Sequence, residues 1–135
     1  MLQKNNFHKL TEIQRCVIPH ALASRDILAA SKTGSGKTLS FVIPVIENLY
    51  RKKWTVLDGL GALVILPTRE LALQVFEVFK CLLEKGHELT LGLLIGGKNI
   101  EIEKNVINRM NILVCTPGRL LQHINESFTL SFDNV

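Results

Sequence analysis

Residues 31–38 read Ser-Lys-Thr-Gly-Ser-Gly-Lys-Thr, and this stretch sets the architecture expected for the whole chain. The mostly apolar segment from Asp26 to Ala30 precedes it, and apolar residues at helical spacing follow it. This order predicts a short buried strand, a turn and a helix. Gly34 and Gly36 would let the backbone wrap closely around phosphate oxygens, and the helix dipole would add to the attraction. The sequence therefore predicts a phosphate-binding loop; a glycine-rich helix start without a ligand is the alternative.

The residue types in this loop match the parts of a nucleoside triphosphate bound with Mg²⁺. Lys37 is expected to reach the β and γ phosphates, and the Thr38 hydroxyl is expected to hold Mg²⁺. The strict loop pattern has Gly where Ser31 stands, but the strand before and the helix after support the match. The other residues expected to surround the phosphates are Thr33, Gly34, Ser35 and Gly36.

Strands and helices alternate along the rest of the chain. A helix is predicted from Thr11 to about Leu22, and the helix after the loop contains Pro44, which should kink it. Three more strand-helix units follow, with strands at Ala62 to Leu66, Thr90 to Ile95 and Ile112 to Cys115. Strands this apolar, separated by helices, predict an α/β fold whose parallel sheet is covered by helices on both faces.

Right-handed crossovers would place all four strand-to-helix turns along one edge of the sheet. Thr68 and Thr116 are good N-caps, and any one of these turns alone would be only a well-made helix start. Together, exposed amides and nearby cations form a track suited to a nucleic acid backbone, bound without sequence preference. The residues expected to contact it are Pro67, Thr68, Arg69, Gly96, Gly97, Thr116, Pro117, Gly118 and Arg119.

Gln14 has two interpretations. Thr11 and Gln14 have the spacing of a capping box, in which Gln14 only ties down the start of the helix. The Gln14 amide also offers a donor and an acceptor together, which matches the edge of adenine. Spacing alone favours the cap.

Composition sets the limits within which these motifs are interpreted. The chain has 135 residues, 47% of them hydrophobic, which suits one globular domain or part of one. Its net charge of +4 is compatible with a polyanionic partner without requiring one. No membrane span or signal peptide is apparent, so an intracellular protein is expected. Three distant cysteines are expected to be reduced and buried, and the four histidines lack metal-ligand spacing.

Five segments resemble the motifs of the DEAD-box ATP-dependent RNA helicases, in the order in which that family carries them. They are Phe7 to Gln14 (Q motif), Ser31 to Thr38 (motif I), Pro67 to Ala72 (motif Ia), Gly96-Gly97 (GG) and Thr116 to Leu120 (motif Ib). The resemblance implies a P-loop, RecA-like domain that uses ATP and Mg²⁺ to unwind or remodel RNA. It also implies that Gln14 recognises adenine, and that RNA lies across motifs Ia, GG and Ib.

No Asp-Glu-Ala-Asp sequence occurs before the end at Val135. Residues 1–135 are therefore expected to be the first part of a RecA-like domain, from the Q motif through motif Ib. Motif II and the second RecA-like domain are absent, so the chain alone is expected to bind ligands without turnover. The alternative is a non-catalytic nucleotide- or RNA-binding module. A different P-loop enzyme is disfavoured, because no Asn-Lys-x-Asp guanine signature appears.

The segment from Tyr50 to Ala62 resembles the helicases that act in ribosome biogenesis. This resemblance implies pre-ribosomal RNA as the partner and the nucleus or nucleolus as the location, with the cytoplasm as the alternative. A monomer without membrane association is expected.

Overall fold

The computed structural model describes residues 9–84, 86–97, 100–107, 109–126 and 135. The chain divides into one unit spanning Met1–Lys53 and a second spanning Trp54–Val135, and each is described by itself. No helix among the described residues combines the length and apolar character that crossing a membrane requires.

The first unit is built on two helices, α1 (Glu12–Leu22) and α2 (Lys37–Arg51). Both were predicted, and both continue through an internal proline, Pro19 in α1 and Pro44 in α2. Their buried apolar side chains recur at helical spacing, as in Val42, Ile46 and Leu49 of α2 and Ile18 of α1. The two helices pack against each other.

The strand predicted over Asp26 to Ala30 is not found. These residues have no regular secondary structure and are exposed. A strand exists only through pairing with a neighbour, and the ladders in the described residues join only β1, β2 and β3. The prediction failed because an apolar run shows that a segment can be a strand, but not that a partner is available.

The second unit contains a three-stranded parallel sheet in the order β1-β3-β2. The strands are β1 (Ala62–Ile65), β2 (Leu91–Leu94) and β3 (Ile112–Cys115), and a short 3-10 helix, η2 (Val56–Asp58), precedes β1. The central strand, β3, is buried throughout, which explains its uninterrupted apolar sequence. All three strands were predicted to within a residue at each end.

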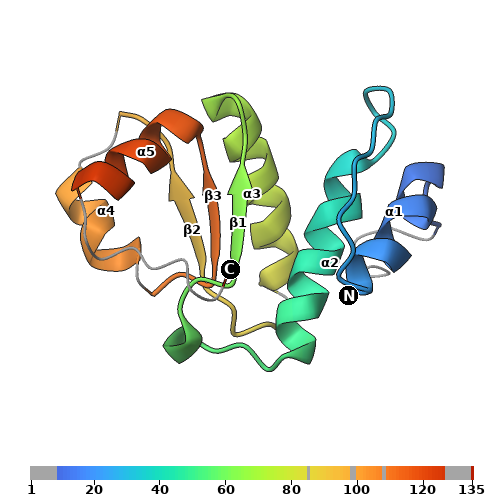
Figure 1. Cartoon of the computed structure of the whole chain (residues 1–135), viewed down its shortest axis with the longest axis horizontal. Helices are drawn as coiled ribbons and strands as arrows, with labels where there is room; N and C mark the ends of the chain where they lie inside the picture. The colour runs from blue at the N-terminus through green and yellow to red at the C-terminus, as the bar shows by residue number, and fades with distance from the viewer. Residues whose placement is uncertain (1–8, 85, 98–99, 108, 127–134) are drawn as a thin grey trace. The chain divides into compact units, whose positions relative to one another are not determined.

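Helices cover both faces of this sheet, as predicted. They are α3 (Arg69–Leu83), α4 (Ile100–Ile107) and α5 (Pro117–Glu126), with α3 on one side of the strands and α4 and α5 on the other (Figure 1). Leu113 and Cys115 of β3 pack with Ile107 of α4 and Leu120 of α5 in one core cluster. Because side chains alternate along a strand, Ile112 and Val114 point to the opposite face, which α3 covers.

The amino ends of the strands are tied together by Asn111, which is 0% exposed. Its Nδ2 donates to the carbonyls of Thr55 (2.8 Å) and Gly59 (2.9 Å). Its Oδ1 accepts from the backbone N and the Oγ1 of Thr90, each at 3.1 Å. All four hydrogen-bonding positions of the amide are therefore used, and the turn before β1 is fixed to the start of β3.

The three cysteines are free thiols, but only Cys115 is buried. Cys16 and Cys81 are exposed, so the expectation of three buried thiols was wrong for two of them. Both lie on amphipathic helices, where the hydrophobic character of a residue does not decide on which face it falls.

Candidate functional site

The predicted phosphate loop lies in the first unit, immediately before α2. Gly34 and Gly36 have φ values of +76° and +88°, in the left-handed region that favours glycine. Gly36 is the N-cap of α2, so the first amides of the helix follow directly from the loop. This is the arrangement that a bound phosphate needs, because unpaired helix amides and the helix dipole both attract anions.

Lys37 folds back over its own loop. Its Nζ donates to the carbonyl oxygen of Ser31, and also to that of Lys32 at 2.7 Å. The Oγ atoms of Ser31 and Ser35 lie 2.6 Å apart, a second contact that holds the loop closed. The ammonium is thus already directed at oxygen atoms within the loop, where phosphate oxygens would offer it a stronger, charged acceptor.

Gln14 connects α1 to this loop. Its Oε1 accepts from the backbone N of Thr11 at 3.0 Å, which is the capping contact predicted from spacing. Its Nε2 donates to the carbonyl oxygen of Gly36 at 3.0 Å, a contact that spacing did not predict. The side chain is buried at 5% exposure, so the Q-motif glutamine serves as a cap and also holds the loop.

A hollow of about 650 Å³ lies beside the loop, between it and the first turns of α1. It is lined by Thr11, Glu12, Ile13, Cys16, Ala30, Ser31, Lys32 and Ser35. Its lining includes Ile13, which precedes Gln14 in the chain, and Ser31 and Ser35 of the loop, so a nucleotide base seated in it would lie beside the loop. The predicted site residues Gln14 and Ser31 to Thr38 are therefore brought together in one unit.

The residues present fit a magnesium ion held mainly by a nucleotide. Thr38 follows Lys37 in the first turn of α2 and is half-buried. Among the described residues, no group of three or more His, Cys, Asp or Glu side chains is placed to hold a metal by itself. Mg²⁺ in nucleotide sites typically takes one or two protein oxygens together with phosphate oxygens and water, and a single hydroxyl suits that role.

In the second unit, the sheet register brings the other three turns to one edge. Ile65 of β1 and Leu94 of β2 both pair with Cys115 of β3, at the carboxyl ends of the three strands. The segments that follow therefore leave the sheet side by side. They hold the predicted residues Pro67, Thr68, Arg69, Gly96, Gly97, Thr116, Pro117, Gly118 and Arg119.

Arg69 lies directly against the glycine pair of the neighbouring turn. A Cβ atom added to Gly96 would lie 2.7 Å from Nη2 of Arg69, and one added to Gly97 would lie 3.6 Å from Nη1. Gly97 also has a φ of +100°. Thr68 caps α3 by accepting from the backbone N of Leu71 at 3.3 Å, which fixes Arg69 in the first helical turn. Because Arg69 is exposed, its guanidinium can meet a phosphate at this edge.

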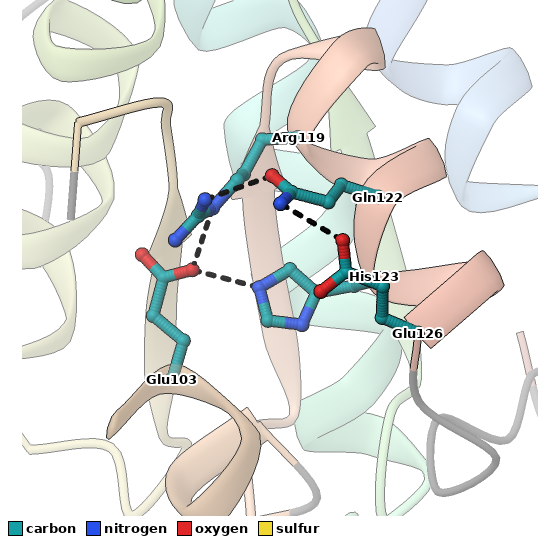
Figure 2. Close-up of polar contacts among 5 residues, drawn as sticks. All are labelled: Glu103, Arg119, Gln122, His123 and Glu126. Atoms are coloured by element: carbon teal, nitrogen blue, oxygen red, sulfur yellow. Dashed lines mark hydrogen bonds and ion pairs between the residues drawn. The ribbon is translucent and has the colours of Figure 1, made fainter. Parts of the chain in front are cut away.

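Arg119 is placed differently from the exposed cation that the sequence suggested. It is only 8% exposed, and its Nε donates to Oε2 of Glu103 at 2.9 Å. His123 Nε2 lies 2.7 Å from the same carboxylate oxygen. Figure 2 shows these three side chains converging between α4 and α5.

Sequence reasoning missed Glu103 and gave His123 no role. Arg119 and His123 are four residues apart, which places them on the same face of a helix, and this spacing was an available signal. Nothing in the sequence pairs that face with Glu103 in α4, because the pairing depends on how α4 and α5 pack.

Comparison with known proteins places this geometry in a family. The DEAD/DEAH box helicase family matches residues 11–135. The ATP-dependent RNA helicase dbp4 of Schizosaccharomyces pombe is 61% identical over 132 residues, which are 98% of this chain and 18% of the relative. The DBP4 helicase of Coccidioides immitis is 56% identical over 98% of this chain and 16% of its own length. The chain thus spans less than a fifth of these relatives.

Two solved structures resemble the fold closely. A DEAD box protein from Methanococcus jannaschii aligns with a TM-score of 0.87 and 40% identity, covering 99% of this chain and 35% of its own. Mss116p bound to ssRNA and AMP-PNP aligns with a TM-score of 0.89 and 31% identity, covering 99% of this chain and 28% of its own. The fold is therefore the RecA-like α/β fold, and the chain belongs to the DEAD/DEAH box helicase family.

Proposed function

We propose that this chain supplies the ATP-binding loop and part of the RNA-binding edge of an ATP-dependent RNA helicase. The observation that carries the proposal is the link between Gln14 and the loop, through the 3.0 Å hydrogen bond to Gly36. This contact joins the residue expected at the base to the residues expected at the phosphates. Such an arrangement suits a site for one adenine nucleotide.

In this proposal, ATP binding exchanges the partners of Lys37. The ammonium leaves the carbonyls of Ser31 and Lys32 and binds β and γ phosphate oxygens, which are charged acceptors. The amides of the loop and of the first turn of α2 would bind the same phosphates, and the Ser35 amide would give up its 3.4 Å hydrogen bond to the Lys32 carbonyl. The Thr38 hydroxyl would hold Mg²⁺, which neutralises charge that builds up on the phosphates during transfer.

Gln14 would recognise adenine by reorienting an amide that now bonds to backbone. Its Oε1 is bound to the Thr11 amide and its Nε2 to the Gly36 carbonyl. A base in the neighbouring hollow would offer both a donor and an acceptor to the same side chain. Binding of the base would therefore break the hydrogen bond to the Gly36 carbonyl, next to the phosphates.

RNA would lie on the carboxyl edge of the sheet in the second unit. The N-termini of α3 and α5 direct amides to this edge, and Arg69 adds an exposed cation beside Gly96. These groups bind phosphate and sugar, and they do not read bases. Mss116p, whose fold this chain shares, was solved with ssRNA and AMP-PNP, and that supports assigning both ligands to this fold.

The proposed setting is a nuclear or nucleolar protein that acts on pre-ribosomal RNA. The segment from Tyr50 to Ala62 resembles ribosome-biogenesis helicases, and the relatives at 61% and 56% identity carry the dbp4 name. Hydrolysis would need catalytic groups that are not among residues 1–135, because the sequence contains no Asp-Glu-Ala-Asp. The chain alone is expected to bind ATP and RNA as a monomer without turnover.

Substitution of Lys37 tests the proposed nucleotide site. Lys37→Ala should weaken binding of a fluorescent ATP analogue to this chain by about 10- to 100-fold, because a hydrogen bond between charged groups is lost. Arg51→Ala is the matched control. It removes a cation from the other end of α2, about 21 Å away along the helix axis, and should leave affinity unchanged. Equal affinity of the Lys37→Ala variant and the unaltered chain would refute the assignment.

A further inference from the structure

Glu103 is a buried carboxylate that joins α4 to α5. It is 8% exposed, and its Oε2 bonds to Nε of Arg119 at 2.9 Å and to Nε2 of His123 at 2.7 Å. Arg119 Nη1 also donates to Oε1 of Gln122 at 2.9 Å, and Gln122 Nε2 donates to Oε1 of Glu126 at 3.0 Å (Figure 2). Both bonds of the carboxylate to α5 converge on one oxygen.

The position of this cluster relates it to the RNA edge. α4 begins at Ile100, shortly after Gly96 and Gly97, and Glu103 lies in the first turn of that helix. Arg119 lies in the first turn of α5, directly after Pro117 and Gly118. The Glu103–Arg119 pair therefore fixes the start of one helix to the start of the other, and each start follows a turn expected to hold RNA.

The environment of Arg119 does not suit a direct phosphate contact. Its guanidinium is buried and its charge is balanced by Glu103, so meeting a phosphate would require breaking a buried ion pair. Glu103 Oε1 and His123 Nδ1 have no hydrogen-bond partner among the described residues. The free-energy cost of burying the Glu103 carboxylate is therefore offset mainly by its two bonds through Oε2. Arg69, in contrast, is exposed at the same edge.

We infer that Glu103 is a positioning residue for RNA binding, and that Arg119 acts through Glu103 and does not contact phosphate itself. The pair holds the Gly96-Gly97 turn and the Thr116–Gly118 turn at the spacing that the RNA backbone requires. The inference rests on the proposed RNA-binding function of this edge. Among the described residues of this edge, it assigns the phosphate contact to Arg69.

The salt dependence of RNA affinity separates a phosphate contact from a positioning role. Binding of a fluorescent single-stranded RNA is measured over a range of salt concentrations. Arg69→Gln should reduce the slope of log affinity against log salt by about 0.7, the value for one phosphate contact on a single strand. Arg119→Gln and Glu103→Gln should each weaken binding roughly tenfold, with the slope unchanged. Glu77→Gln, the same change at an exposed site in α3, should have no effect.

A double substitution should restore the RNA affinity that each single substitution lowers. Glu103→Gln with Arg119→Gln replaces the ion pair by an amide-amide hydrogen bond without a buried charge, so affinity should recover to within about threefold of the unaltered chain. A phosphate contact by Arg119 predicts instead that the double variant binds as weakly as Arg119→Gln alone. The double variant also serves if a single variant fails to fold, because it leaves no unpaired charge.

Amide NMR shifts test the positioning role without RNA. The shifts of Gly96 and Gly97 should move in each single variant and return in the double variant, whereas those of Gly34 and Gly36, in the other unit, should stay fixed. The inference would be overturned if the Gly96 and Gly97 shifts did not move in the single variants. It would also be overturned if Arg119→Gln reduced the salt slope while Glu103→Gln left RNA binding unchanged. If the unaltered chain binds no RNA, the proposed function fails, and the glycine shifts still decide whether Glu103 positions the turn.

Discussion

Gly36 has no room for a side chain. A Cβ atom at this position would lie 2.5 Å from Nε2 of Gln14 and 3.2 Å from Oγ1 of Thr11, and the φ of +88° already favours glycine. The glycine thus serves two needs at once, the bend of the phosphate loop and the close approach of Gln14. A larger residue here would displace the Gln14 amide, which links the proposed adenine site to the predicted phosphate loop.

At Cys115, burial controls chemical reactivity. Desolvation raises the pKa of its thiol to about 11, because the charged thiolate is disfavoured in the core. At pH 8 only about a thousandth of this thiol would be thiolate, the form that reacts with alkylating agents.

We therefore expect iodoacetamide at pH 8 to modify Cys16 and Cys81 in the native chain and to spare Cys115. Mass spectrometry of the labelled chain would show this, and unfolding in urea should make the third thiol reactive. Labelling of Cys115 at the rate of Cys16 under native conditions would contradict its position in the core.

Among the elements, the start of β3 is held by a single amide. Asn111 makes four side-chain hydrogen bonds, to Thr55, Gly59 and Thr90, and so joins the turn around η2 to two strands. Trp54 Nε1 donates to the same Gly59 carbonyl at 3.0 Å. The turn before β1 is therefore ordered by polar contacts to a buried group.

Asn111→Ala should lower the free energy of unfolding by roughly 2–4 kcal/mol, because several partly buried polar groups lose their partner. Urea unfolding followed by the fluorescence of Trp54, the single tryptophan, reports on this region. Gln74→Ala is the control, since that amide is exposed in α3 of the same unit, and its loss should cost under about 1 kcal/mol. Equal losses in the two variants would contradict the role given to Asn111.

The elements also show how far the sequence could lead. The strands β1, β2 and β3 were predictable because each is a short apolar run between turn residues, and α1 and α2 because their apolar residues follow helical spacing. Asp26 to Ala30 has the same apolar character, yet it lacks a strand partner among the described residues. Pairing is a long-range property, and local composition does not contain it.

The candidate site was predictable to a similar degree. The phosphate loop could be predicted from glycines at fixed spacing, because such glycines mark positions where the backbone bends sharply. The burial of Arg119 does not, because it depends on Glu103 lying in a helix that meets α5 only after folding. Residues whose role depends on the local backbone conformation, such as these glycines, can be found in a sequence. Residues whose role depends on a tertiary partner, such as Arg119, require the structure.

At the scale of the molecule, the residues predicted to bind ATP and RNA lie in two different units. The residues proposed to bind nucleotide lie in Met1–Lys53, and those proposed to bind RNA lie in Trp54–Val135. The proposed helicase activity would couple the two, and residues 1–135 contain no Asp-Glu-Ala-Asp, which that proposal needs for hydrolysis. The chain alone should therefore bind ATP and RNA without hydrolysing ATP.

We expect this chain alone to hydrolyse ATP at least about 10³-fold more slowly than a chimera in which it replaces the matching segment of the Schizosaccharomyces pombe relative. The rest of that relative, which is named an ATP-dependent RNA helicase, would supply the remaining catalytic groups. RNA-stimulated phosphate release would measure the difference. Lys37→Ala in the chimera should abolish turnover. An isolated chain as fast as the chimera would show that the catalytic groups lie within residues 1–135.

The contact of Lys37 with the Ser31 and Lys32 carbonyls has a consequence for selectivity. An incoming anion must compete with two acceptors that are tethered to the lysine and lose little entropy in binding it. A single phosphate group can contact fewer of the loop amides than a polyphosphate, so it gains less free energy when it displaces the carbonyls. We therefore expect the resting loop to favour ATP over inorganic phosphate and AMP.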